Sequence, residues 1–303
     1  MVKLFRKIFA VILVLNFTHL YAEDSVDKFG EMLAEIVAKN YPNSSLDSLE
    51  GMKARSVPIE LEAFELEDMR NLDKNCIFNN VMSYTKKPFS GKWGRPTDVH
   101  ETVHGINNAL SNIKSGSRAF YVGQGKAIWI QEPNVTMDNI VPLIPEKLRG
   151  YRFPLYFLEQ KKYWNDVALY PLEEWCAYIA GAECAVDDYQ KYNIDPTKYK
   201  SYPYNAATAV RTDEVSGSLE FAIYCTALAI CVSQKDKEYW ENHTQFKIAI
   251  KFFLIKAEKV FFEGKDIFKS EKQDKLLHAL QNSNEGVNIR NFLLTQFDGV
   301  FIE

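Results

Sequence analysis

A long apolar stretch constrains the fold of this chain more than any other feature. Residues 213–232 read "DEVSGSLEFAIYCTALAICV", and from Leu219 to Val232 apolar side chains occur nearly all round the helical repeat. A helix that is apolar on every side has to be buried among other elements, because any exposed face would leave apolar surface in water. The sequence therefore predicts a central core helix here.

Other segments have apolar residues at helical spacing and are predicted to pack around that core. The one-sided stripes of "FKIAIKFFLIKAEKVFF" (246–262) and "KQDKLLHALQN" (272–282) are typical of flanking helices. "PLEEWCAYIAGAECAVDDYQKY" (171–192) begins with a proline, which suits a first helical turn. Further helices are predicted at 25–40 and, in shorter form, around 154–165.

The clearest strand pattern is "AFYVGQGKAIWIQEP" (119–133). Two runs of β-branched and aromatic residues flank a Gly-Gln-Gly turn at 123–125, which predicts a hairpin. Residues 58–70 are acidic and fit a helix or a loop. No repeat or linker indicates a domain boundary, so we expect one mainly α (α+β) domain over 23–303, with a small β-hairpin.

Composition places the chain among globular proteins. Its 303 residues are 47% hydrophobic and 25% charged, which is enough to bury a sizeable core. The formal net charge is -4, and the lysines and arginines are scattered rather than clustered. Because nucleic acids and anionic membranes attract concentrated positive charge, we expect no nucleic-acid partner.

The first 22 residues have the pattern of a cleaved secretory signal. Three basic residues precede an unbroken apolar run at 8–15, and Ala22 is a small residue suited to the cleavage site. The run is shorter than the roughly 20 residues that cross a bilayer, and no later run reaches that length without charges. We therefore expect a secreted or periplasmic protein with no stable membrane insertion after cleavage of residues 1–22; the alternative is an uncleaved N-terminal anchor.

Five cysteines in an exported chain allow at most two disulfides. Cys176 and Cys184 fall in one predicted helix, and Cys225 and Cys231 in another, at separations too long for a bond within either pair. Either bridges link different elements, or most of these cysteines act as small buried apolar residues.

Two histidines lie four residues apart in "TDVHETVHGINNAL", on a helix expected to start near 96–98 and end by 114–117. Side chains at this spacing lie one above the other, so His100 and His104 can bind one metal ion, with Glu101 beside its water. An accidental H-E-x-x-H in this chain has a probability of about 0.4%. The motif therefore predicts metal-assisted hydrolysis; the alternative is an ordinary polar helix rim.

A zinc site needs a third protein ligand. His243 and His278 have no other ligand type at useful spacing, so solvated or capping roles are expected for both. Leu110 occupies the position where metzincins carry their third histidine, which excludes that class.

"HETVHGINNAL", followed downstream by "EEWCAY", resembles the gluzincin class of zincin metallopeptidases, whose third ligand is a glutamate on a second helix. In several branches of that class, a small residue follows this glutamate at plus three, and Asp, Glu or Tyr follows at plus four or five. Glu174 matches, with Ala177 and Tyr178 at these positions. Glu173 and Glu183 agree less well and are the alternatives. The resemblance implies a zincin-like helical domain that binds Zn2+ through His100, His104 and the chosen glutamate.

The chemistry of such a site assigns further roles. Glu101 would take a proton from the attacking water and pass it to the leaving amine. Tyr178 and Arg211 are candidates for stabilising the oxyanion that forms. Hydrogen-bond partners for the imidazoles are also expected. Candidates for these partners are Asn107, Asp187 and Asp188.

Three functions follow from these patterns. The leading hypothesis is an exported zinc-dependent hydrolase, a metallopeptidase or amidase whose substrate is a peptide or cell-wall peptide. The second is a zincin-like metal-binding module without peptidase activity, whose hairpin at 119–133 offers an edge to a partner strand. The third is a metal-free helical interaction protein.

Overall fold

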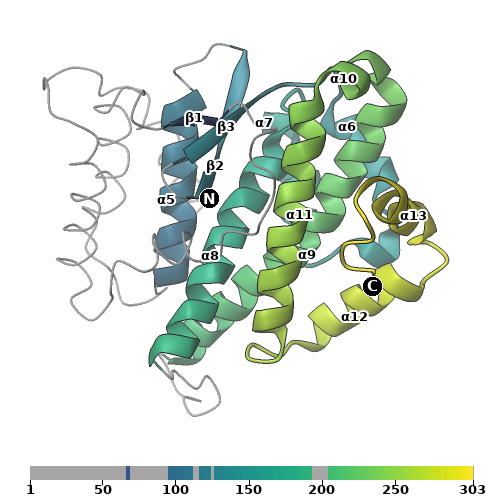
Figure 1. The fold of residues 1–303 in the computed structure, drawn as a ribbon. Helices are drawn as coiled ribbons and strands as arrows, with labels where there is room; N and C mark the ends of the chain where they lie inside the picture. Colours follow the sequence, from purple (N-terminus) through teal and green to yellow (C-terminus); the bar gives the residue numbers. More distant parts are fainter. Residues whose placement is uncertain (1–65, 69–94, 112–115, 124–125, 193–203, 303) are drawn as a thin grey trace, which may run out of the picture.

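The computed structural model describes residues 66–68, 95–111, 116–123, 126–192 and 204–302 (Figure 1). The predicted signal sequence (1–22), the predicted helix at 25–40 and Cys76 lie outside these residues. The helices and strands described, in chain order, are β1 (Leu66–Asp68), α5 (Arg95–Ser111), β2 (Ser117–Gly123), β3 (Lys126–Gln131), α6 (Met137–Ile140), the 3-10 helices η4 (Val141–Leu143) and η5 (Glu146–Leu148), the π-helix η6 (Pro154–Glu159), α7 (Lys161–Trp164), α8 (Tyr170–Tyr192), α9 (Tyr204–Lys235), α10 (Lys237–Asn242), α11 (Thr244–Lys265), α12 (Glu271–Asn282) and α13 (Val287–Gln296).

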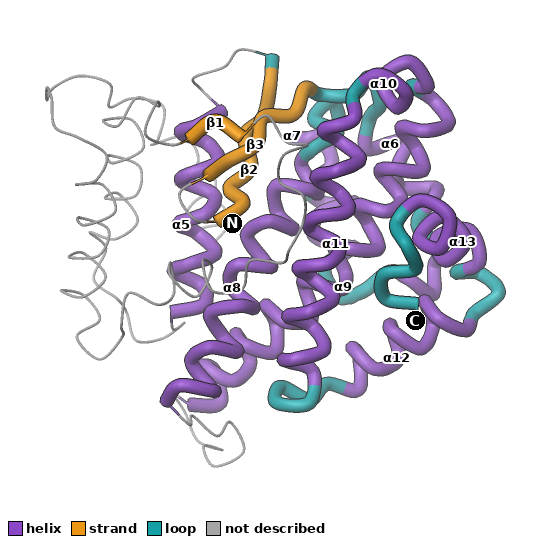
Figure 2. The backbone as a smooth tube through the Cα atoms, in the orientation of Figure 1, coloured by secondary structure: helices purple, strands orange, loops and turns teal. Residues whose placement is uncertain are grey.

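The architecture is mainly helical with one small sheet, as the sequence predicts (Figure 2). Helices α8, α9 and α11 pack against one another, and α5 packs on α8 beside the sheet. One continuous cluster of buried apolar residues joins these elements. Each fully buried Leu, Ile or Phe in it contributes about 1.5–3 kcal/mol relative to leaving it exposed, so this cluster is the main source of folding free energy.

Helix α9 is the predicted core helix. Every residue from Leu219 to Val232 is buried. The helix is longer than predicted because it begins at Tyr204, before the apolar stretch. By length and composition alone, the part of α9 from Ala209 to Lys235 could cross a membrane. However, 94% of its apolar 18-residue segment is buried inside the protein, so this helix is weak evidence for a membrane span.

The sheet contains the predicted hairpin and one strand that was not predicted. Strands β2 and β3 pair antiparallel, and β1 pairs antiparallel with the other edge of β3, in the order β1-β3-β2. The expectation of helix or loop for 58–70 is therefore wrong for Leu66–Asp68. A three-residue strand is too short to show an alternating pattern, and only its partner β3 determines its conformation.

The outer edge of β2 is attached to α5 and α8 by side chains. The Ser111 hydroxyl accepts a hydrogen bond from the Ala119 N–H at 2.9 Å, and the Asn107 Oδ1 accepts one from the Tyr121 N–H at 2.7 Å. The Cys176 thiol donates to the Tyr121 carbonyl at 3.2 Å. These two N–H groups are therefore not available to a partner strand, and the bonds hold α5 and α8 in a defined orientation against the sheet.

The side chains of the four described cysteines are buried, so these cysteines behave as small apolar residues. The predicted helix at 154–165 is observed as η6 followed by α7, and the predicted helix at 171–192 is α8. Short helices α6 and α10, and the longer α13, were not predicted.

Candidate metal centre

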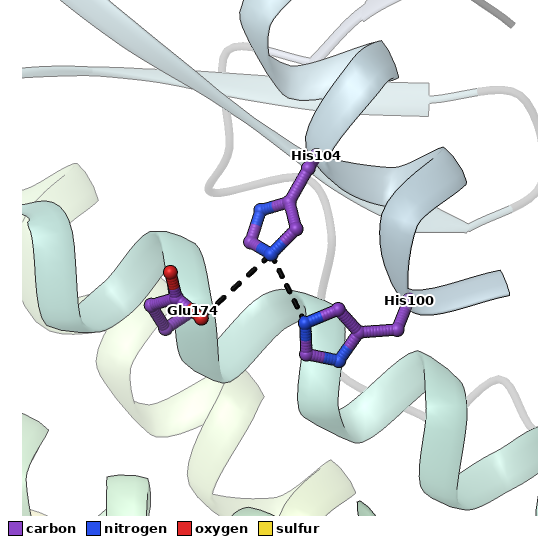
Figure 3. Close-up of side chains that lie close together, drawn as sticks. All are labelled: His100, His104 and Glu174. Carbon is purple, nitrogen blue, oxygen red and sulfur yellow. Dashed lines mark hydrogen bonds and ion pairs between the residues drawn. The ribbon is translucent and has the colours of Figure 1, made fainter. Parts of the chain in front are cut away.

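The motif helix α5 presents both histidines toward α8. Val103 is 1% exposed and packs into the core, while the rings of His100 and His104 lie next to each other with centroids 4.8 Å apart. Glu174 projects from α8 toward the same point, as Figure 3 shows. The spacing of four residues produces this arrangement because positions i and i+4 share one helix face.

The distances between the three groups suit a metal ion. The Nε2 atoms of His100 and His104 are 3.0 Å apart, and the Glu174 Oε2 lies 3.7 Å from the His104 Nε2. One ligand atom from each residue lies within 4.8 Å of the other two. A tetrahedral zinc ion at about 2.0–2.1 Å from each ligand separates its donor atoms by about 3.3–3.5 Å. This donor set therefore fits zinc with small side-chain adjustments.

The opposite ring nitrogens face carboxylates. The His100 Nδ1 lies 3.0 Å from the Glu214 Oε2, and the His104 Nδ1 lies 2.6 Å from the Glu173 Oε1. An ionised carboxylate only accepts hydrogen bonds, so each Nδ1 carries the proton and donates it. In the neutral rings both Nε2 lone pairs then point at one another, and a cation or an additional proton has to lie between them.

The surrounding carboxylates make this point strongly favourable for positive charge. Burial opposes the charged form of His104, but Glu173 and then Glu174 outweigh it and raise its pKa to about 10. Burial likewise opposes the charge of His100, yet Glu214 raises its pKa above the usual value. A metal ion at these nitrogens would therefore compete with a proton.

Glu101 is exposed, although His100 next to it is buried. Its carboxylate raises the pKa of both His100 and His104, so it lies within electrostatic range of the two rings. A carboxylate at the solvent side of a metal centre is where a general base can exchange protons with water.

Tyr178 lies against His100, with ring centroids 4.5 Å apart and ring planes at 85°. The Tyr178 hydroxyl is 3.1 Å from the hydroxyl of Tyr156, and the Arg152 guanidinium lies 4.6 Å over the Tyr178 ring. A Cβ on Gly217 would come within 2.2 Å of that ring, so the glycine leaves the room that Tyr178 occupies. Burial raises the pKa of the Tyr178 hydroxyl, which keeps it protonated as a donor.

The two alternative third ligands have other partners. Glu173 is engaged with the outer nitrogen of His104, and Glu183 forms a buried ion pair with Lys256 at 3.2 Å. Among the other predicted residues, Asn107 accepts its bond from β2, and Arg211 is buried on α9, one turn before Glu214. The side chains of Asp187 and Asp188 lie outside the described set. His243 stands at the N-terminal cap of α11 without a side-chain capping bond, and His278 is exposed on α12.

Sequence reasoning missed Glu214, the partner of His100. The available signal was a glutamate just before the stretch of α9 that is apolar on every side, because a buried charge requires a partner. Nothing in the sequence named that partner, since His100 and Glu214 are 114 residues apart.

No family model matches the chain, and no curated protein or solved structure matches it. What the chain does must therefore be inferred from its own residues.

Proposed function

We propose that this chain is an exported, zinc-dependent hydrolase of the zincin type that cleaves an amide bond in a peptide or cell-wall peptide. The observation that carries the proposal is the convergence of the two Nε2 atoms and a Glu174 oxygen within 4.8 Å. Two imidazoles and a carboxylate are a common zinc ligand set, and three protein ligands leave a position for water or substrate.

Different residues are proposed to bind the metal ion and to transfer the proton during hydrolysis. His100, His104 and Glu174 would hold the ion. Bound zinc supplies Lewis-acid chemistry, lowering the pKa of a water molecule and polarising a carbonyl. Glu101 takes the proton of the attacking water and delivers it to the leaving amine, which requires a carboxylate that reaches both substrate and solvent. Its exposed position supports this role.

Tyr178 is the candidate donor to the developing oxyanion. Arg152 over its ring and the neighbouring Tyr156 hydroxyl orient it, and its protonated hydroxyl is the form that donates. The export of the chain is proposed from the signal pattern at 1–22.

The first test is metal analysis of the purified mature chain, residues 23–303. We expect close to one zinc per chain, lost in His100→Ala and retained in His278→Ala, which removes an exposed histidine on α12. Two imidazoles and one carboxylate also bind iron(II) in oxygenases. Stoichiometric iron in place of zinc, or no metal at all, would overturn the proposal.

The second test separates a hydrolase from a metal-binding module. Glu101→Gln should lower cleavage of a peptide library by about 10²–10⁴-fold, because general-base catalysis is lost. Zinc content should stay unchanged, since Glu101 is not a proposed ligand. Glu241→Gln, at an exposed glutamate on α10, is the matched control and should keep full activity. Wild-type protein that binds zinc but cleaves nothing in the library would favour the module.

A further inference from the structure

Two carboxylates hold the two histidines of α5 from the side opposite the metal centre. Glu214 on α9 contacts the His100 Nδ1, and its side chain is 6% exposed. Glu173 on α8 contacts the His104 Nδ1, and its side chain is 16% exposed. Each carboxylate thus accepts a hydrogen bond from Nδ1, so that Nδ1 cannot bind the metal ion. The Nε2 lone pair is then the one that points at the shared centre.

The Glu214 carboxylate fits against α8 because the residue of α8 that it contacts, Gly181, has no side chain. A Cβ on Gly181 would lie 2.3 Å from the Glu214 Oε2 and 2.6 Å from its Cδ, distances that no real Cβ tolerates. Glycine in the middle of a helix costs about 0.5–1 kcal/mol relative to alanine, so its presence here needs a reason. Gly181 follows Glu174 by seven residues, which places both on the face of α8 that looks toward the centre.

We propose that Glu214 and Glu173 are positioning residues that fix the ring orientation and the Nε2 lone pair of His100 and His104, and that Gly181 is required to seat Glu214. The proposal rests on the proposed function only in needing a metal ion at these two nitrogens. Carboxylates that accept from a ligand histidine also raise the basicity of the ring, and their loss typically costs 10–100-fold in metal affinity.

The two positioning residues act through different helices. Glu173 is adjacent to the proposed ligand Glu174, so α8 provides both the third ligand and the partner of His104. Glu214 lies on α9, so its contact with His100 links α5 to α9 rather than to α8. The orientation of His100 thus depends on the packing of a third helix, whereas that of His104 depends only on the α5 and α8 contact.

The first experiment measures the affinity of the full mature chain for Zn2+, by competition with a chromophoric chelator. Glu214→Gln and Glu173→Gln should each bind zinc 10–100-fold more weakly. The absorption spectrum of the Co2+-loaded protein should also change, because ring orientation and basicity alter the ligand field. Thermal unfolding of the metal-free variants is the control for stability: the loss of zinc affinity should be larger than any fall in metal-free stability accounts for, since Gln keeps the hydrogen-bonding shape of the carboxylate.

Unchanged zinc affinity and an unchanged Co2+ spectrum in both variants would overturn the proposal. A fall in affinity that only parallels a fall in the metal-free unfolding midpoint would also overturn it, because a purely structural role predicts that pattern. Failure of the wild-type chain to bind either ion would instead refute the metal centre of the proposed function.

The second experiment tests the role of Gly181. Gly181→Ala should weaken zinc binding about as much as Glu214→Gln, because the added methyl displaces the carboxylate. In a Glu214→Ala background the same substitution should have no further effect, since the crowded side chain is gone. Equal losses in the two backgrounds would show that Gly181 acts apart from Glu214 and would overturn this part.

Gly264→Ala is the matched steric control. Its Cβ would meet the Val215 side chain at 2.8 Å, so it also adds a methyl against α9, next to Glu214 in sequence. Val215 is buried in the apolar core rather than at a histidine. Gly264→Ala should therefore change stability while leaving zinc affinity within twofold of the wild type, and a loss equal to that of Gly181→Ala would count against the proposal.

Discussion

Two of the core regions that contain buried charge differ in how that charge is balanced. Lys256 on α11 and Glu183 on α8 are 5% and 2% exposed, and each Glu183 oxygen lies 3.2 Å from the lysine Nζ. One positive and one negative charge meet there. Around the histidines of α5, by contrast, Glu173, Glu174 and Glu214 come together beside two groups that are ordinarily neutral.

The difference indicates what each region does. A balanced buried pair compensates for desolvation and holds two helices together, but it leaves no capacity for a ligand. An excess of carboxylates beside converging lone pairs is costly unless a cation joins it. The pair of α8 and α11 therefore stabilises the fold, whereas the charge of the cluster of α5, α8 and α9 is what the proposed ion would balance.

The largest effect that we predict is the loss of zinc binding when one proposed ligand is removed. His104→Ala should abolish zinc binding, because two remaining ligands cannot complete the site. Lys256→Met, which disrupts the balanced pair, should keep zinc at the wild-type stoichiometry provided that the protein is folded. Metal analysis after dialysis measures both, and zinc retained by His104→Ala would contradict the assignment of the cluster.

A smaller effect is expected at the balanced pair. Lys256→Met should lower the free energy of unfolding by about 3–5 kcal/mol, because it leaves the Glu183 charge buried without its lysine. Adding Glu183→Leu should recover most of this loss, since apolar replacement of both partners is often neutral or stabilising. Urea unfolding of the metal-free proteins measures the two changes. A Lys256→Met variant as stable as the wild type would show that the pair is not held as described.

The smallest effect concerns proton competition. The metal-free protein holds a proton on His104 through neutral pH because Glu173 and Glu174, against the effect of burial, raise its pKa to about 10. This proton is held below that pKa and lost as the pH rises through it. Zinc affinity should therefore rise about tenfold per pH unit over roughly pH 7–9, with about one proton released per zinc.

Titration calorimetry in buffers of different ionisation enthalpy measures this proton release. An ordinary histidine, with a pKa of about 6.5, would release almost no proton at about pH 8. Affinity that does not change with pH over this range would show that the carboxylates do not act on His104 as the geometry indicates.

Several elements follow from local sequence patterns. The helix over 171–192 begins with a proline that suits a first turn, the core helix from 213 onward contains a long stretch that is apolar on every side, and the hairpin has its own turn residues. Strand β1 escaped prediction because three residues show no period, and its conformation depends on the distant β3. The 3-10 and π segments between β3 and α8 also depend on tertiary contacts.

The amino-acid sequence by itself determined that His100 and His104 share one helix face, because four residues make about one helical turn. The resemblance to gluzincins also narrowed the candidates for a third ligand to glutamates on one helix. Only the tertiary structure decided between neighbours: adjacent helical residues point about 100° apart, so the rotation of α8 against α5 directs Glu174 to the shared centre and Glu173 to the outer nitrogen. The contact of Glu214 with His100 likewise exists only through the packing of α9, since no local pattern links residues so distant in the chain.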